Sequence, residues 1–97
     1  MYLLGLDIGT TGVKAVLIDP QGRVLASGSD TYPLHTPQPL WAEQNPHDWW
    51  RATCNAIQQV LRESGVPPSQ IRGVGLSGQM HGSVFLDEQN RVIRPAL

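Results

Sequence analysis

The chain has 97 residues, of which 40% are hydrophobic and 15% charged, and this composition is typical of one small globular domain with a single core. The formal net charge is −1 and the charges are scattered singly, which argues against the basic footprint of a nucleic-acid or anionic-membrane binder. A complete kinase, dehydrogenase or transporter does not fit in this length, so the signature of a large enzyme would mark the chain as part of a longer protein.

The amino-terminal third predicts three consecutive antiparallel strands. Its first run is apolar except at Gly5 and Asp7, as expected of a strand that is buried on both faces. Residues 9–12 supply turn chemistry, and Asp19-Pro20-Gln21-Gly22 suits a type I turn, with Pro second and Gly fourth. We expect the strands at Tyr2–Ile8, Val13–Ile18 and Arg23–Ser27.

A proline-rich loop and one helix follow. Residues 33–46 carry four prolines and no periodic pattern, which indicates a loop. A helix is expected to begin at Pro46, because Asn45 is a good N-cap residue and Pro is favoured at the first helical position, and to end at Gly65. Apolar residues at helical spacing predict its buried stripe: Trp50, Cys54, Ile57 and Leu61, widened by Trp49, Ala56 and Val60.

The remaining residues predict a strand, a loop and a hairpin. We expect a buried strand at Ile71–Ser77, a sharp loop at residues 78–82 and hairpin strands at Ser83–Leu86 and Arg91–Ile93. Residues 17–25 and 85–93 share Asp, Gln, Arg and Val in register, which the common sequence rules of hairpins explain more simply than a duplication. The whole order is an α/β fold in which the helix packs on the sheet.

Features that are absent from the sequence indicate the cellular compartment and exclude some classes of partner. Cys54 is the single cysteine, so neither an intrachain disulfide nor a cysteine cluster for a metal can form, and a reducing compartment is favoured. The apolar run at the start is short and has no basic lead, unlike a signal peptide, and no stretch approaches the roughly 20 apolar residues of a spanning helix. We expect a cytoplasmic protein without nucleic-acid or membrane partners.

The strongest chemical signal is the segment Asp7–Lys14, in which a carboxylate ends a buried strand and a Gly/Thr turn leads into the next. Such a turn can direct backbone N–H groups and Thr hydroxyls to a phosphate, while the acid holds a magnesium ion through its waters. The alternative is a simple hairpin in which Asp7 caps the turn and Lys14 is solvated. An acid in an apolar strand is costly without a partner, which favours the functional interpretation.

The other candidate motifs are weaker. Gly73–Gly78 fits the pattern of a dinucleotide fingerprint, but no helix is expected after it, and no Gly-Lys-Ser/Thr of a Walker loop occurs. His81 lies in a loop with glycines, where an imidazole suits a polyol ligand; the alternative is a turn histidine bonded to backbone. His35 and His47 are expected to be solvated. Packing roles are expected for Trp41, Trp49, Trp50 and Cys54.

Several segments resemble the FGGY family of carbohydrate kinases, within the actin-like (ribonuclease H-like) ATPase superfamily. Residues 6–17, Leu-Asp-Ile-Gly-Thr-Thr-Gly-Val-Lys-Ala-Val-Leu, resemble its first phosphate segment, and residues 39–50 its passage from loop to helix. Residues 78–82, Leu86-Asp87 and residues 94–97 are similar to those of members that act on D-xylulose. The resemblance implies that residues 1–97 are the amino-terminal, incomplete part of the first domain of such a kinase.

The resemblance also implies the reaction, transfer of the terminal phosphoryl group of magnesium-ATP to the 5-hydroxyl of D-xylulose. Glu43 and Gln44 could orient the proline-rich loop near the sugar. The catalytic base would lie beyond Leu97, so these residues alone are expected to be inactive. By the same resemblance, Asp7 is important for activity and holds Mg²⁺ through water, Thr10, Thr11, Gly12 and Lys14 face the phosphates of ATP, and Met80 and His81 contact the sugar.

Two alternatives stay open. The first is a kinase of the same family for another polyol or ketose, such as glycerol, ribulose or gluconate, and residues 79–82 would separate these substrates. The second is a non-catalytic actin-like assembly or sensor domain that keeps the phosphate turn; a downstream catalytic Asp would favour the enzyme, and its absence the sensor. An uncovered sheet edge or apolar face also predicts self-association of the chain, for example as a homodimer.

Overall fold

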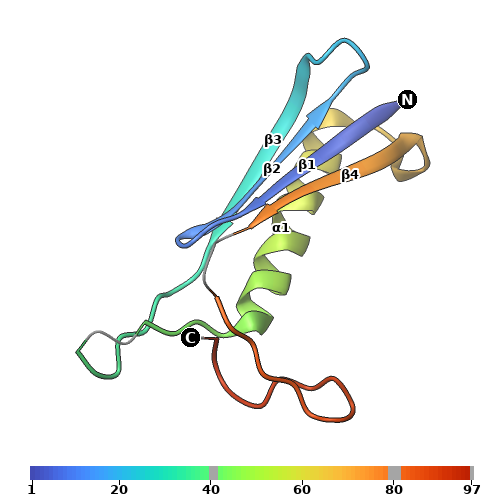
Figure 1. The fold of residues 1–97 in the computed structure, drawn as a ribbon. Helices are drawn as coiled ribbons and strands as arrows, with labels where there is room; N and C mark the ends of the chain where they lie inside the picture. Colours follow the sequence, from blue (N-terminus) through green and yellow to red (C-terminus); the bar gives the residue numbers. More distant parts are fainter. Residues whose placement is uncertain (40–41, 79–81, 97) are drawn as a thin grey trace.

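The computed structural model describes residues 1–39, 42–78 and 82–96, which form a sheet with one long helix on one of its faces (Figure 1). The elements are β1 (Tyr2–Ile8), β2 (Gly12–Ile18), β3 (Val24–Thr31), α1 (Pro46–Ser64), a short 3-10 turn η1 (Pro68–Gln70) and β4 (Ile71–Gly78). The sheet order is β3-β2-β1-β4, in which β1, β2 and β3 are antiparallel neighbours and β4 pairs parallel to β1. The predicted α/β class and the predicted order of three strands, helix and strand are confirmed.

The predicted ends of α1 are also confirmed. The Asn45 side chain accepts a hydrogen bond from the His47 backbone N–H at 3.0 Å. Gly65 ends the helix in the left-handed region at φ 68°, where a residue without Cβ is favoured. No helix in the described part of the chain is long and apolar enough to span a membrane.

The buried stripe of α1 agrees with the predicted one only in part. Ala56 and Val60 are buried as predicted, and Ala52 and Thr53 are buried beside them. Trp50 is 71% exposed and does not pack in this core, in contrast to the prediction. Small residues fit this face where the helix lies very close to the sheet. A Cβ built on Gly28 of β3 would lie 2.5 Å from the Ala56 carbonyl oxygen, so the backbones of helix and strand are in close contact at this point.

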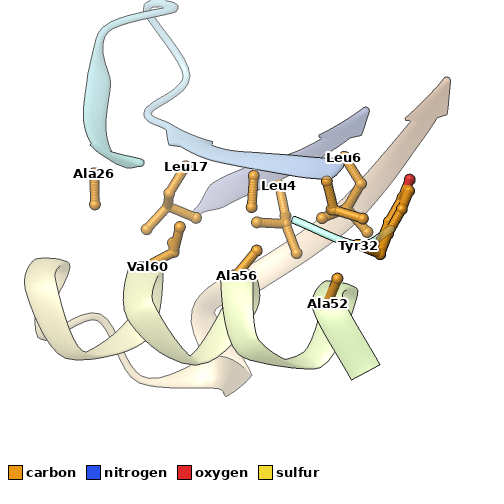
Figure 2. Packing of buried hydrophobic residues seen from close by; sticks show 10 residues of the cluster. Leu4, Leu6, Leu17, Ala26, Tyr32, Ala52, Ala56 and Val60 are labelled. Carbon is orange, nitrogen blue, oxygen red and sulfur yellow. The ribbon is translucent and has the colours of Figure 1, made fainter. Parts of the chain in front are cut away.

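The core lies between α1 and the three antiparallel strands. Figure 2 shows Leu4, Leu6, Leu17 and Ala26 pointing from the sheet toward Ala52, Ala56 and Val60 of the helix, with Tyr32 at one end. Strand register explains the set, because Leu4 pairs with Leu17 and Leu6 with Ala15, and cross-strand partners share a face. Leu17, Val13 and Val60 are the largest fully buried side chains.

β1 and β4 are not buried on both faces as predicted. Val74 and Leu76 pair with Leu4 and Leu6 in register and therefore share the helix side of the sheet, yet they are 59% and 71% exposed. The reason is that α1 packs mainly on β3 and β2 and hardly on β4. The glycine-rich segment 73–78 is a strand throughout, not a strand-to-helix turn, and the expected self-association stays a prediction.

The predicted hairpin at residues 83–93 is a turn with one antiparallel bridge, Leu86 to Val92, and not a pair of strands. This turn has the same hydrogen bonds as the one at residues 19–23. Asp19 and Asp87 each accept two backbone N–H groups on Oδ1, and each forms an ion pair with the Arg four residues later. These hydrogen bonds hold the pKa of both carboxyls below the usual value. Shared turn chemistry thus accounts for the sequence similarity.

Candidate functional site

Three polar side chains from three adjacent strands meet on the face of the sheet that points away from α1. Asp7 near the end of β1 pairs in register with Lys14 of β2 and with Ser77 of β4. The Ser77 hydroxyl donates a hydrogen bond of 2.8 Å to Oδ1 of Asp7. All three residues are exposed. We call this set the Asp7 cluster.

A shallow groove runs along the sheet beside the Asp7 cluster. Gly5 of β1 and Gly75 of β4 pair in register and line it together with Val16 and the cluster itself. A Cβ built on Gly75 would meet no atom within 4 Å among the described residues. The sheet is therefore bare next to its charged residues, and a ligand can approach the strands closely there.

The turn between β1 and β2, residues 9–12, lies next to the cluster and is held through its carbonyl groups. The Tyr32 hydroxyl donates to the carbonyl of Gly9, and the Tyr32 backbone N–H donates to that of Thr11 at 3.3 Å. Between them, Gln44 Nε2 donates to the Thr10 carbonyl at 2.6 Å. The side chains of Thr10 and Thr11 are exposed. Three consecutive peptide units of this turn are thus fixed by the rest of the chain.

Gly12 closes the turn and cannot carry a side chain. Its carbonyl accepts from the Gly9 N–H at 2.9 Å. A Cβ built on Gly12 would lie 2.3 Å from the Asp30 carbonyl oxygen of β3, a contact that only a shift of backbone could relieve. The glycine is therefore required by the close approach of two strands.

The proline-rich loop supplies buried polar side chains to this region. Gln44 is 4% exposed, and its Oε1 accepts from the indole N–H of Trp49 at 3.0 Å. Its backbone pairs with Ala96, while the neighbouring Glu43 forms an ion pair with Arg94. Both acceptor and donor groups of the Gln44 amide are engaged, so the loop is joined to the turn that contains Thr10.

The remaining candidate residues differ in exposure, and some of them lie outside the part of the chain that the structure describes. Met80, His81 and Trp41 lie outside the described residues. His35 and His47 are exposed, as predicted. Cys54 is half-buried at the edge of the helix stripe. Trp49 is half-buried, and it lines a pocket with Ile8, Gly78, Gly82 and Val84.

The described residues contain no group of three or more His, Cys, Asp or Glu side chains that could hold a metal ion. The cluster offers one carboxylate and the hydroxyl of Ser77. This donor set suits Mg²⁺, because that ion keeps several waters and commonly takes one or two carboxylates together with phosphate oxygens. It does not suit a structural ion held by protein ligands alone.

Ser77 and Tyr32 contact the candidate site, but no sequence motif identified them. A signal for Ser77 does exist, since Gly5-Leu6-Asp7 and Gly75-Leu76-Ser77 repeat a Gly-Leu-polar pattern on two strands that turn out to be parallel and in register. Tyr32 has no comparable signal in the sequence. Its contacts with the turn depend on the path of the backbone directly after β3.

The surroundings of the Tyr32 phenol predict how the stability of the protein depends on pH. Burial, and to a lesser extent the negative charge of Asp7, raise the pKa of the Tyr32 phenol above 10.0. In the unfolded chain the phenol loses its proton near pH 10, so the native state binds more protons above that pH and stability falls as pH rises through the folded pKa. In an NMR titration of the Tyr32 ring we expect a midpoint above about 10, the ordinary value for a tyrosine, lowered only in part by Asp7→Asn. A midpoint at or below that ordinary value would contradict this.

Comparisons with known proteins agree with one another. A model of the FGGY family of carbohydrate kinases, N-terminal domain, matches residues 2–97. The chain is 41% identical over all its 97 residues to the xylulose kinase of Escherichia coli (strain K12), covering 19% of that protein. It is 33% identical to the glycerol kinase of Thermococcus gammatolerans, over 99% of this chain and 20% of the relative. The chain thus spans about a fifth of the length of these relatives.

Solved structures give the same result. The structure of a xylulose kinase from Brucella ovis matches with a TM-score of 0.95 at 41% identity, over 100% of this chain and 20% of that one. The structure of a gluconate kinase from Lactobacillus acidophilus matches with a TM-score of 0.90 at 29% identity, over 99% of this chain and 19% of that one.

Proposed function

The chain belongs to the FGGY family of carbohydrate kinases, and from that premise we propose that it is the amino-terminal part of a kinase that transfers the terminal phosphoryl group of ATP to the 5-hydroxyl of D-xylulose. The sheet and helix are those of the amino-terminal domain of this family, with the actin-like ATPase fold expected from the sequence. The single cysteine supports a cytoplasmic location for this reaction.

The observation that carries the proposal is the Asp7 cluster beside the turn at residues 9–12. In our proposal, Asp7 holds Mg²⁺ through its water ligands, and Ser77 keeps the carboxylate in place through its hydrogen bond. When held there, Mg²⁺ would supply positive charge to offset the negative charge that develops on the transferred phosphoryl group. Lys14, adjacent to Asp7 in register, adds a positive charge for the phosphates.

The turn itself is proposed to bind phosphate through its backbone. In a trans peptide the C=O and N–H groups point in opposite directions. Because the carbonyls of Gly9, Thr10 and Thr11 are bound by Tyr32 and Gln44, the N–H groups of residues 10–12 point away from those partners. N–H groups that are left free to face an anion in this way can form a nest for it, and we propose that the hydroxyls of Thr10 and Thr11 contribute.

The choice of D-xylulose is supported by similarity. Identity to the xylulose kinase of E. coli is 41%, compared with 33% for the glycerol kinase. Glycerol, ribulose and gluconate remain the competing substrates, and a gluconate kinase is among the structural relatives. We assign Met80 and His81 to the sugar, with the imidazole hydrogen-bonded to a hydroxyl and the thioether packed on its carbon atoms.

The experiment is ADP release by the full-length protein with D-xylulose, D-ribulose, glycerol and gluconate. We expect D-xylulose to have the highest kcat/KM. We also expect His81→Ala to raise the KM for D-xylulose by about tenfold or more through a lost hydrogen bond, whereas His47→Ala, a change at an exposed histidine, leaves it unchanged. The 97 residues alone should release no ADP. Preference for another substrate would refute the assignment of D-xylulose, and no turnover with any of them would favour the non-catalytic alternative.

A further inference from the structure

We propose that Gln44 is a positioning residue for the phosphate turn, fixing the peptide between Thr10 and Thr11 so that its N–H points to the phosphate site. This inference rests on the proposed function. The relevant contact joins two segments that are 34 residues apart in the sequence, the proline-rich loop and the turn. It is also the hydrogen bond that holds the middle one of the three fixed peptide units.

Two residues, Tyr32 and Gln44, hold different carbonyl groups of the turn. Tyr32 holds the two outer carbonyls, of Gly9 by its hydroxyl and of Thr11 by its backbone N–H. The carbonyl of Thr10 accepts from Gln44 Nε2 at 2.6 Å. The carbonyl of Thr10 and the N–H of Thr11 belong to one planar unit, so the hydrogen bond from Gln44 sets the direction of the Thr11 N–H.

The Gln44 amide has a defined orientation, because its oxygen and its NH2 group have different partners. An indole N–H can only donate, and that of Trp49 donates to Oε1 of Gln44 at 3.0 Å. The oxygen of the amide is therefore turned to Trp49, and its NH2 group to Thr10. Gln44 is only 4% exposed and its hydrogen bond to Thr10 is partly buried, so water replaces this hydrogen bond less readily than it would replace one at the surface.

The backbone of Gln44 is fixed as well, which makes it suitable for positioning. Its N–H donates to the Ala96 carbonyl at 3.0 Å, and its carbonyl accepts from the Ala96 N–H at 2.6 Å. The adjacent ion pair of Glu43 with Arg94 holds the same stretch. A side chain anchored on both sides in this way gives the turn little freedom to rotate its peptides.

The test uses Gln44→Glu in the full-length protein. A carboxylate of the same shape still accepts from Trp49 but cannot donate to the Thr10 carbonyl. We expect the KM for MgATP to rise by about tenfold or more, as for a lost buried hydrogen bond, while the KM for D-xylulose stays within about twofold. Gln58→Glu, the same change at an exposed helix position, should alter neither constant. Equal increases in both constants, or no increase for MgATP, would overturn the proposal.

A second variant covers the case in which Gln44→Glu does not fold. Trp49→Phe removes the group that orients the amide and keeps an aromatic ring, so we expect a smaller increase in the KM for MgATP. Its matched control is Trp50→Phe, at a tryptophan that is 71% exposed. If both changes have the same effect, the proposal is wrong.

A readout that needs no ATP separates this inference from the proposed function. If the wild-type protein binds no MgATP, the proposed function fails. The role of Gln44 in positioning the turn can still be tested, because the NMR amide resonances of residues 10–12 report on it without ATP. The proposal then requires the Thr11 amide resonance to move in Gln44→Glu and to stay in place in Gln58→Glu. An unmoved Thr11 resonance would refute the positioning role.

Discussion

Replacing Asp7 by Asn is expected to lower kcat for sugar phosphorylation by about a thousandfold, as when an interaction with transition-state charge is removed. The amide has the same shape, and its oxygen can accept the hydrogen bond that Ser77 donates to Oδ1 of Asp7. It has no negative charge with which to hold the waters of Mg²⁺. Because Asp7 is exposed, the fold should tolerate the change, and the measurement is ADP release at saturating ATP and sugar.

The control for this prediction is Asp48→Asn. Asp48 lies in the first turn of α1, so its loss removes an equal charge at a position with no proposed role in catalysis. Both variants should unfold at temperatures close to that of the wild type. An activity of Asp7→Asn within about tenfold of the wild type, which corresponds to about 1.4 kcal/mol in the barrier, would contradict the assignment of Asp7 to the metal.

Gly28→Ala is expected to destabilise the protein by about 1–3 kcal/mol, the usual cost of overpacking a core. The added Cβ would lie 2.5 Å from the Ala56 carbonyl oxygen and 2.9 Å from Cβ of Gln59. To avoid these contacts, α1 must move away from β3. That movement would also strain the paired hydrogen bonds between the Gln59 amide and the backbone of Ser29, at 2.9 and 3.1 Å. Denaturant unfolding followed by circular dichroism measures the loss.

Gly75→Ala is the matched control, since it makes the same change in another strand. The added methyl group would meet no atom within 4 Å among the described residues. Removing glycine from a strand also lowers the entropy of the unfolded chain, so we expect a change of about zero or a gain of a few tenths of a kcal/mol. Equal losses in Gly28→Ala and Gly75→Ala would mean that the close approach of helix and sheet does not decide the stability.

Local patterns in the sequence predicted the local structure well. β1 has the predicted bounds, and the cap residues Asn45 and Gly65 define α1 as expected. These features depend on neighbouring residues alone, through turn chemistry, capping and alternation of apolar side chains. Asp7 was singled out for a similar reason, because a carboxylate within an apolar run is visible in the sequence without knowledge of the fold.

The errors concern contacts between distant segments. Hydrophobicity favoured Trp50 for the buried face of α1, whereas Ala52 and Thr53, which the apolar pattern did not single out, are buried there. Apolar residues in β4 predicted burial, but Leu76 is exposed because α1 covers β2 and β3. Burial of a given residue depends on which partner covers it, and the partner is not encoded in the local pattern.

The same reason explains which parts of the candidate site were missed. The contact of Ser77 with Asp7 requires the parallel pairing of β1 with β4, two strands that are separated by the whole of β2, β3 and α1. The contact of the Gln44 side chain with Thr10 likewise depends on how the proline-rich loop lies against the turn. Both contacts are consequences of topology, whereas the turn at residues 9–12 was recognisable from its own sequence.

The most direct test is a crystal structure of the full-length protein with Mg²⁺, a non-hydrolysable ATP analogue and D-xylulose. We expect the terminal phosphates on the N–H side of residues 10–12 and a water ligand of Mg²⁺ hydrogen-bonded to Asp7. D-Xylulose should contact His81. Phosphates bound away from this turn, with Asp7 remote from the metal, would contradict the proposal that this segment is the phosphate site of a sugar kinase.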